Sequence, residues 1–149
     1  MDIYKRGKNM KNVLVLCTGN SCRSQIAHGY LEHFTDRSKV VIYSAGVETH
    51  GVNPNAISSM QDDGIDISNY TSNNINEYLS IDFDFVITVC DNAKEHCPYF
   101  PTNAKKFHYN FPDPAKAKGT DDEIKHEFQV VRQLIKDYCQ KFVKENLIF

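Results

Sequence analysis

The sequence lacks a charge excess, a long hydrophobic run and any repeat, and each absence excludes a class of protein. Its 17 Lys and Arg against 19 Asp and Glu leave a net charge of −2, so no basic field indicates nucleic acid or an anionic membrane as a partner. The apolar runs, such as 13–17 and 85–90, are five or six residues long, whereas a transmembrane helix needs about 20. No linker or low-complexity tract divides the chain, and we expect one domain.

The first residues of the chain are basic, as in the leading part of a signal peptide. A signal peptide also needs an apolar stretch of about 7–15 residues and a small-residue cleavage site, and neither follows. We therefore expect a cytoplasmic protein. Met10 offers a second start, so we expect residues 1–10 to be a flexible extension and residues 11–149 to form the single domain.

The composition is that of an ordinary folded domain. Of the 149 residues, 41% are hydrophobic and 24% are charged, which excludes disorder as the dominant state. A chain of this length buries roughly 68–70% of its unfolded surface, enough for a core without disulfides or metals.

Strand-like and helix-like segments alternate along the chain. Short apolar runs predict buried strands, and these lie at residues 11–17, 39–44, 83–90 and 105–109. Apolar residues at helical spacing predict helices, and these lie at 26–34, 53–64 and 121–146, with a weaker turn at 74–79. On the last helix the predicted apolar stripe is Ile124, Phe128, Val131, Leu134, Ile135, Tyr138 and Phe142. The alternation indicates an α/β fold of three layers, a four-stranded parallel sheet flanked by helices.

The five cysteines are an odd number, whereas a secreted disulfide framework is usually even and carried by a smaller chain. They are Cys17, Cys22, Cys90, Cys97 and Cys139. In a reducing compartment such thiols indicate redox or nucleophilic chemistry, a zinc site, or buried small side chains. A zinc site would use Cys90, His96, Cys97 and His108, but this spacing does not match the usual ligand pairs.

The segment after the first strand has the residues of an anion-binding loop. It consists of Cys17, Thr18, Gly19, Asn20, Ser21, Cys22, Arg23 and Ser24. A loop between a parallel strand and a helix presents backbone N–H groups and the helix N-terminus to an anion. Arg23 adds a planar fork for two oxygens of a tetrahedral oxyanion, and the same positive field favours the thiolate of Cys17.

The other loop residues have supporting roles. Gly19 gives the backbone freedom, Asn20 tolerates a left-handed conformation, and Ser24 offers a hydroxyl to the Cys17 thiolate. We interpret Cys22 as a packing residue rather than a second nucleophile, and Cys139 as a structural residue of the last helix. The alternative is a plain strand–turn–helix corner with two buried cysteines.

On these residues the chain resembles the low-molecular-weight protein tyrosine phosphatases and the thioredoxin-coupled arsenate reductases built on the same fold. The resemblance begins in residues 13–25 and covers nearly everything from 11 to about 142. It continues through residues 43–46, 48–54, 65–68, 86–98 and 113–114.

Three features separate the two branches, and all of them favour the reductases. The phosphatases usually carry proline where this chain has Gln25, and tyrosines after the Asp-Pro pair where this chain has Ala115. The reductases carry two further cysteines, which match Cys90 and Cys97.

The resemblance implies a sequence of thiol reactions. Cys17 attacks arsenic in an oxyanion held by Arg23 and the loop, and Asp113 protonates the departing oxygen. Cys90 then forms a disulfide with Cys17 and releases arsenite. Cys97 attacks Cys90, which moves the disulfide to the Cys90–Cys97 pair, and thioredoxin reduces it. The reaction needs no metal or organic cofactor, and we expect a monomer that binds arsenate or phosphate but neither nucleic acid nor a membrane.

Two other functions remain open from the sequence. The first is a protein tyrosine phosphatase that uses water in place of Cys90. The second is a non-enzymatic thiol or zinc-binding regulator that uses the fold as a sensor.

The spacing of Cys90 and Cys97 predicts a conformational change. Residues 91–96 are polar and begin with good helix N-caps. A helix of seven residues rises about 10 Å, whereas a disulfide needs Cα atoms within about 7 Å. Closing this disulfide therefore requires the short helix to unwind, and a helix of this length is marginal by itself.

Some members of the family bind potassium beside the loop through oxygen ligands. Positions Asn20 and Ser44 match two of these ligands, but His28 and Asn73 replace a glutamate and an aspartate. Because a hard cation prefers carboxylate ligands, we expect no potassium site here.

Overall fold

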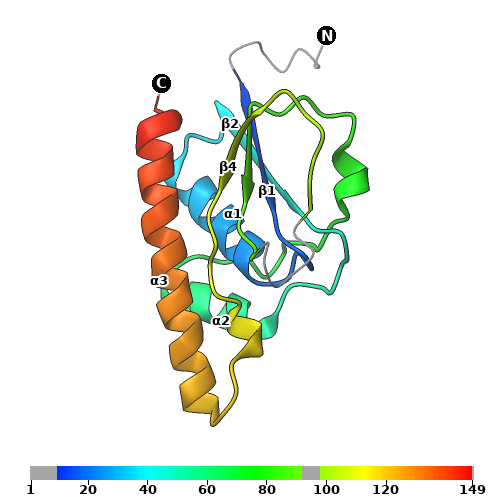
Figure 1. The fold of residues 1–149 in the computed structure, drawn as a ribbon. Helices are drawn as coiled ribbons and strands as arrows, with labels where there is room; N and C mark the ends of the chain where they lie inside the picture. The colour runs from blue at the N-terminus through cyan, green and yellow to red at the C-terminus, as the bar shows by residue number, and fades with distance from the viewer. Residues whose placement is uncertain (1–9, 92–97, 149) are drawn as a thin grey trace.

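The computed structural model describes residues 10–91 and 98–148 (Figure 1). Residues 1–9 of the expected extension, Cys97 and all but the first residue of the expected 91–96 helix lie outside this range. The elements in chain order are β1 (Lys11–Leu16), α1 (Arg23–Phe34), β2 (Val40–Ala45), α2 (Pro54–Asp62), η2 (Ile75–Tyr78), β3 (Phe85–Thr88), β4 (Lys105–His108), η3 (Pro114–Lys116) and α3 (Asp121–Asn146). The predicted strands and helices are present, and the weaker turn is the 3₁₀-helix η2. The short 3₁₀-helix η3 was not predicted.

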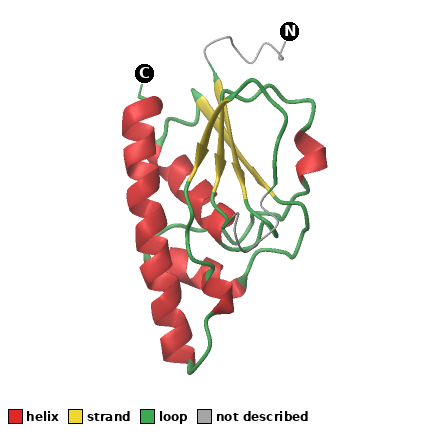
Figure 2. Ribbon diagram, viewed as in Figure 1, coloured by secondary structure: helices red, strands yellow, loops and turns green. Residues whose placement is uncertain are grey.

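The strands form one four-stranded parallel sheet, as predicted, and their order in the sheet is β2-β1-β3-β4. Figure 2 shows that they all point to the same end of the molecule, opposite the C-terminal end of α3. The strand β1 is continuously apolar because it lies inside the sheet and both of its faces are buried. Val13 and Val15 face a large core cluster, whereas Leu14 and Leu16 face a smaller one.

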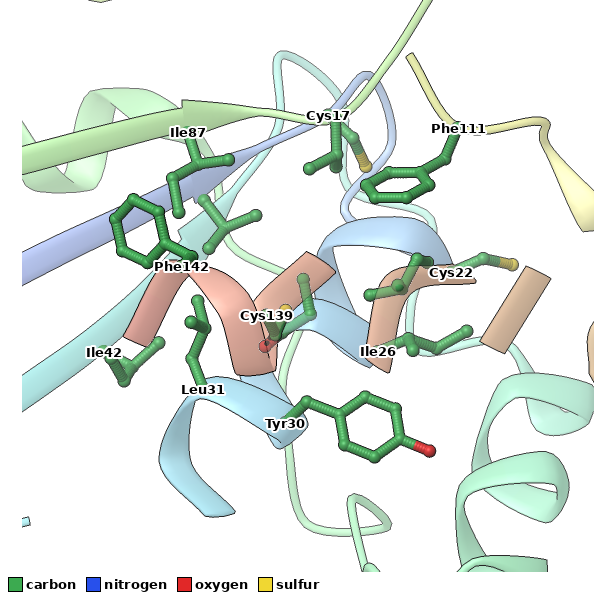
Figure 3. Close-up of a cluster of buried hydrophobic side chains, with 14 of the residues drawn as sticks. Cys17, Cys22, Ile26, Tyr30, Leu31, Ile42, Ile87, Phe111, Cys139 and Phe142 are labelled. Carbon is green, nitrogen blue, oxygen red and sulfur yellow. Dashed lines mark hydrogen bonds between the residues drawn. The ribbon is translucent and has the colours of Figure 1, made fainter. Parts of the chain in front are cut away.

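The two clusters define the three layers of the fold. The larger cluster lies between the sheet and the three α-helices, and Figure 3 shows part of it, where side chains of α1 and α3 meet those of the sheet. The smaller cluster joins the other face of the sheet to η2 and to Phe100. The helices are therefore distributed unequally over the two faces of the sheet.

Local signals fix where the helices begin. Pro54 opens α2, and the side chain of Asn53 accepts a hydrogen bond from the backbone of Asn55. At the start of α3, Thr120 and Glu123 form a reciprocal capping box.

The predicted apolar stripe of α3 was wrong at Leu134, which is 43% exposed. The buried face of α3 instead runs through Phe128, Val131, Ile135, Cys139 and Phe142. Leu134 lies at the margin of this face, beside Phe107 and Tyr109 in a shallow groove.

The third strand, β3, ends before the predicted residue 90 because its partner strand β1 ends at Leu16. Thr88 pairs with Leu16, the last residue of β1. One further bond, from Val89 N to Leu16 O at 2.9 Å, follows before the chain leaves the sheet. Cys90 therefore lies two residues beyond β3 rather than at its end.

In the part of the chain that the structure describes, no helix is both long enough and apolar enough to span a membrane.

Candidate active site

A cavity of about 310 Å³ opens at the carboxyl ends of β1 and β3, the edge at which parallel α/β sheets bind ligands. Its floor is the loop between β1 and α1, including Cys17, Gly19 and Arg23. His50, Asp113, Ala115 and Lys116 line it from outside the loop. The structure thus brings Asp113, from a distant part of the sequence, to the same cavity as Cys17 and Arg23.

Three carbonyls of the loop accept hydrogen bonds from the segment that follows β2. Thr18 O accepts from Glu48 N at 3.1 Å, Gly19 O from His50 N at 3.2 Å, and Ser21 O from Asn53 N at 3.1 Å. Because the N–H and C=O groups of a trans peptide point in opposite directions, the N–H groups of these peptides point away from the segment after β2 and are available to a ligand. The loop is therefore built to hold an anion.

Two backbone features hold the loop in this shape. Asn20 has φ of 48°, the left-handed conformation that the sequence predicts for it. Gly46, just after β2, lies so close to the loop that a Cβ there would be 2.5 Å from Thr18 O and 2.9 Å from Cys17 O. Only glycine leaves room for the loop at this point.

A chain of hydrogen bonds leads to the Cys17 sulfur. Asn20 Nδ2 donates to Ser24 Oγ at 2.7 Å, and Ser24 Oγ lies 3.1 Å from Cys17 Sγ. All three residues are buried. Since Ser24 Oγ accepts from Asn20, its own hydrogen is available to the Cys17 sulfur.

Arg23 joins the loop to the segment that carries Asp113. Its Nη1 donates to Phe111 O at 3.3 Å, and its Nη2 lies 3.7 Å from Asp113 Oδ2. Asp113 Oδ1 accepts from Ala115 N at 3.0 Å, which caps η3. The carboxyl group is therefore held at the mouth of the cavity and is 21% exposed.

Two other cysteines have the environment of packing residues. Burial raises the pKa of Cys22 to about 12, with a further contribution from the Asp113 charge. Burial also raises the pKa of Cys139, whose Sγ lies 3.8 Å from Ala27 O between α1 and α3. Both thiols stay protonated at neutral pH.

Cys90 is fully buried. The Val89–Leu16 bond attaches its segment to the end of β1, one residue before Cys17. Cys90 is disulfide-bonded, whereas Cys17, Cys22 and Cys139 are free. Cys97 lies outside the described residues.

The oxygen atoms of Ser44 and Asn20 that could ligate potassium are hydrogen-bonded within the protein. His28 Nδ1 lies 2.8 Å from Ser44 Oγ, and Asn20 Oδ1 accepts from Asn73 N at 2.7 Å. A hard cation prefers carboxylate ligands. Here the His28 imidazole contacts Ser44, and residue 73 is an asparagine, so these residues do not fit such a cation. Within residues 10–91 and 98–148 no cluster of three or more His, Cys, Asp or Glu side chains could hold a metal. The zinc hypothesis involves His96 and Cys97, which lie beyond those ranges.

Several supporting residues were not predicted from the sequence. Gln25 is fully buried and donates to both Asn20 O and Thr71 O at 3.0 Å, and Ser72 Oγ donates to Asn20 O at 2.9 Å. Gln25 was noted only as a departure from the phosphatases. The available signal for Gln25 was a polar residue in the first turn of the predicted helix, next to the anion-binding loop. Ser72 is too far from the loop in the sequence for its contact with Asn20 to be predicted.

Comparisons with known proteins agree on the family. A family profile described as low molecular weight phosphotyrosine protein phosphatase matches residues 12–147. A relative named arsenate reductase in Oceanobacillus iheyensis is 47% identical over 134 residues, which cover 90% of this chain and 96% of the relative. Another of that name in Bacillus subtilis is 45% identical over 135 residues, with coverage of 90% and 96%.

Solved structures give the same result. One described as an arsenate reductase in the oxidized state has a TM-score of 0.77 at 29% identity, and covers 91% of this chain and 98% of its own. A second, in the phosphate binding state, has a TM-score of 0.75 at 31% identity with the same coverage.

Proposed function

Because the chain belongs to the low-molecular-weight phosphotyrosine protein phosphatase family, we propose that Cys17 is the nucleophile of an enzyme that reduces arsenate to arsenite. The relatives of 45–47% identity described above carry that activity in their name. The observation that supports reduction rather than hydrolysis is Cys90, a second thiol position attached to the end of β1. A phosphatase needs only water at this point.

The first step is substitution at arsenic. The loop N–H groups and Arg23 bind the oxyanion, and the Cys17 thiolate forms an S–As bond. The As–O bond opposite Cys17 breaks, and Asp113 donates a proton to the departing oxygen. Ser24 holds the thiolate before attack.

The second step transfers electrons. The Cys90 thiolate attacks the Cys17 sulfur, the S–As bond breaks, and its electron pair remains on arsenic. Arsenic(V) is thereby reduced to arsenic(III) and leaves as arsenite, while Cys17 and Cys90 are oxidised to a disulfide.

The third step regenerates the nucleophile. Cys97 attacks Cys90 and releases the Cys17 thiolate, and thioredoxin then reduces the Cys90–Cys97 disulfide. The arrangement in which Cys90 is disulfide-bonded and Cys17 is free is the one expected after the attack by Cys97. We place the enzyme in the cytoplasm, where thioredoxin keeps thiols reduced. We propose that it acts as a monomer.

The test is multiple turnover with a defined reductant. Wild-type protein supplied with thioredoxin, thioredoxin reductase and NADPH should oxidise NADPH only when arsenate is added. The same assay with glutaredoxin and glutathione should be much slower. Hydrolysis of an aryl phosphate without any arsenate-dependent NADPH oxidation, in either system, would identify a phosphatase instead.

A further inference from the structure

His50 lines the cavity from outside the catalytic loop. It lies in the segment that follows β2, and its backbone N–H donates to Gly19 O at 3.2 Å. This bond fixes the start of the side chain against the loop. No step of the proposed reaction uses the imidazole, although it stands at the same cavity as Cys17 and Arg23.

The orientation of the ring follows from its partner. His50 Nε2 lies 2.7 Å from Glu48 Oε1. Since a carboxylate only accepts hydrogen bonds, Nε2 carries the proton in this contact. The other nitrogen, Nδ1, is the ring atom nearest to the loop, at 2.8 Å from the position that a Cβ on Gly19 would occupy. Glu48 thus turns the Nδ1 edge of the ring toward Gly19, at the rim of the cavity.

We propose that His50 is a further oxyanion-binding residue, which contacts an oxygen of the bound arsenate or phosphate through Nδ1. The proposal rests on the proposed function for its substrate. A partly protonated tetrahedral oxyanion carries both O⁻ and O–H groups. Nδ1 accepts a hydrogen bond from O–H when the ring is neutral and donates one to O⁻ when it is charged, so it complements the ligand in either state.

The contact should affect binding more than the chemical step. His50 lies at the rim, whereas the S–As bond forms at Cys17 on the floor of the cavity. An interaction made equally with substrate and transition state changes KM and leaves kcat nearly constant. A residue that only braced the loop would change both, because it would displace Cys17 and Arg23.

Two substitutions separate the two ring nitrogens. His50→Gln extends an amide toward Glu48 and leaves nothing at the Nδ1 position, whereas His50→Asn places an amide near Nδ1 and loses Glu48. The side chain is 57% exposed, so neither change should prevent folding. His33→Gln, at an exposed histidine in the last turn of α1, is the matched control.

The measurement is the Kd for inorganic phosphate by titration calorimetry on reduced protein, together with KM and kcat for arsenate. His50→Gln should raise both Kd and KM by about three- to tenfold, the factor expected for one net hydrogen bond, with a much smaller change in kcat. His50→Asn should recover part of this loss, and His33→Gln should match wild type.

The phosphate Kd does not depend on turnover, so it tests His50 even if arsenate is not reduced. Unchanged Kd and KM in His50→Gln would overturn the proposal. So would a larger loss in His50→Asn than in His50→Gln, because that order would assign the role to the Glu48 contact.

Discussion

At the scale of single residues, two hydrogen bonds place a hydroxyl group at the Cys17 sulfur. Asn20 donates to Ser24, and this leaves the Ser24 hydroxyl hydrogen for the Cys17 sulfur. Burial raises the pKa of both Cys22 and Cys139, and at Cys22 it outweighs the opposing hydrogen bond from Ser21. Burial therefore keeps Cys22 and Cys139 protonated, whereas the proposed nucleophile Cys17 has the Ser24 hydroxyl beside its sulfur.

The substitution Ser24→Ala tests this direction. It removes the donor to the thiolate and should slow alkylation of Cys17 at neutral pH, and arsenate turnover with it, by about tenfold, since a hydrogen bond to a charged group contributes about 1.5–3 kcal/mol. Alkylation is followed by mass spectrometry of the labelled peptide. Cys139→Ser is the control and should leave both rates at the wild-type level. Equal alkylation rates in Ser24→Ala and wild type would mean that Ser24 does not act on the sulfur.

The sequence predicted candidate residues of the cavity itself, but not the residues that hold the loop in place. Cys17 and Arg23 could be proposed from the residue types and spacing of the loop, whereas Asp113 was proposed from the resemblance to the family. The side chains of Gln25 and Ser72 donate to backbone carbonyls of the loop, and any polar side chain at the right place in space could do the same. Their roles became visible only when distant segments were placed against residues 18–21.

At the scale of elements, the end of β2 and the catalytic loop fit together through Gly46. The substitution Gly46→Ala would place a Cβ 2.5 Å from Thr18 O, and a backbone atom cannot rotate away. We expect about 1–3 kcal/mol of destabilisation from overpacking and about a hundredfold loss of activity from displacement of the loop.

The control for Gly46→Ala is Gly64→Ala. Gly64 has a positive φ of 78° with open space around it, just beyond α2. Gly64→Ala should destabilise the fold through backbone strain by roughly 1–2 kcal/mol and leave arsenate and phosphate kinetics unchanged. If Gly46→Ala kept its activity at temperatures where it is folded, the close fit of β2 against the loop would not matter for catalysis.

Three helices meet at Asp63, the residue that follows α2. Its Oδ2 accepts from the Tyr30 hydroxyl of α1 at 2.6 Å and from Lys136 Nζ of α3 at 2.9 Å. These hydrogen bonds, that of Tyr30 first, hold the pKa of Asp63 below its ordinary value of 3.8.

A lowered pKa of Asp63 in the folded state gives a defined pH dependence. The stabilisation is fully present above pH 3.8 and is lost as the pH falls through the lower folded pKa. Asp63→Asn should therefore cost about 1–2 kcal/mol in the free energy of unfolding at pH 7, the charge-dependent part of two hydrogen bonds. Urea unfolding at pH 7 and near pH 3 measures it. A difference between variant and wild type that did not shrink at the lower pH would exclude a charged Asp63 as the source.

The prediction of elements from sequence succeeded where the signal was local. The Asn53-Pro54 start of α2 and the long stripe of α3 are properties of a few neighbouring residues. The end of β3 was misplaced because it depends on where β1 ends, which is a property of the pairing between Leu16 and Thr88. Leu134 was misplaced because burial at the margin of a helix face depends on what packs beside it.

At the scale of the whole molecule, the positions beside the loop that match the family's potassium ligands are hydrogen-bonded to other side chains and backbone groups of the protein. His28 contacts Ser44, and the side chain of Asn20 is bonded to both Ser24 and Asn73. Replacing potassium by a large organic cation at matched ionic strength should therefore leave the melting temperature and turnover unchanged. A clear rise in melting temperature that is specific to potassium would show that the oxygen atoms of Asn20 and Ser44 bind the ion after all.

The central claim, that Cys90 turns a phosphatase-like loop into a reductase, is tested most directly by a single turnover without external reductant. Pre-reduced wild-type protein mixed with arsenate should form about one arsenite per chain, because the thiol relay holds one electron pair for arsenic before a reductant is needed. Cys90→Ser should form none yet still hydrolyse an aryl phosphate, which needs only the loop and Asp113, whereas Cys17→Ser should do neither. Arsenite formed by Cys90→Ser in the wild-type amount would contradict the account.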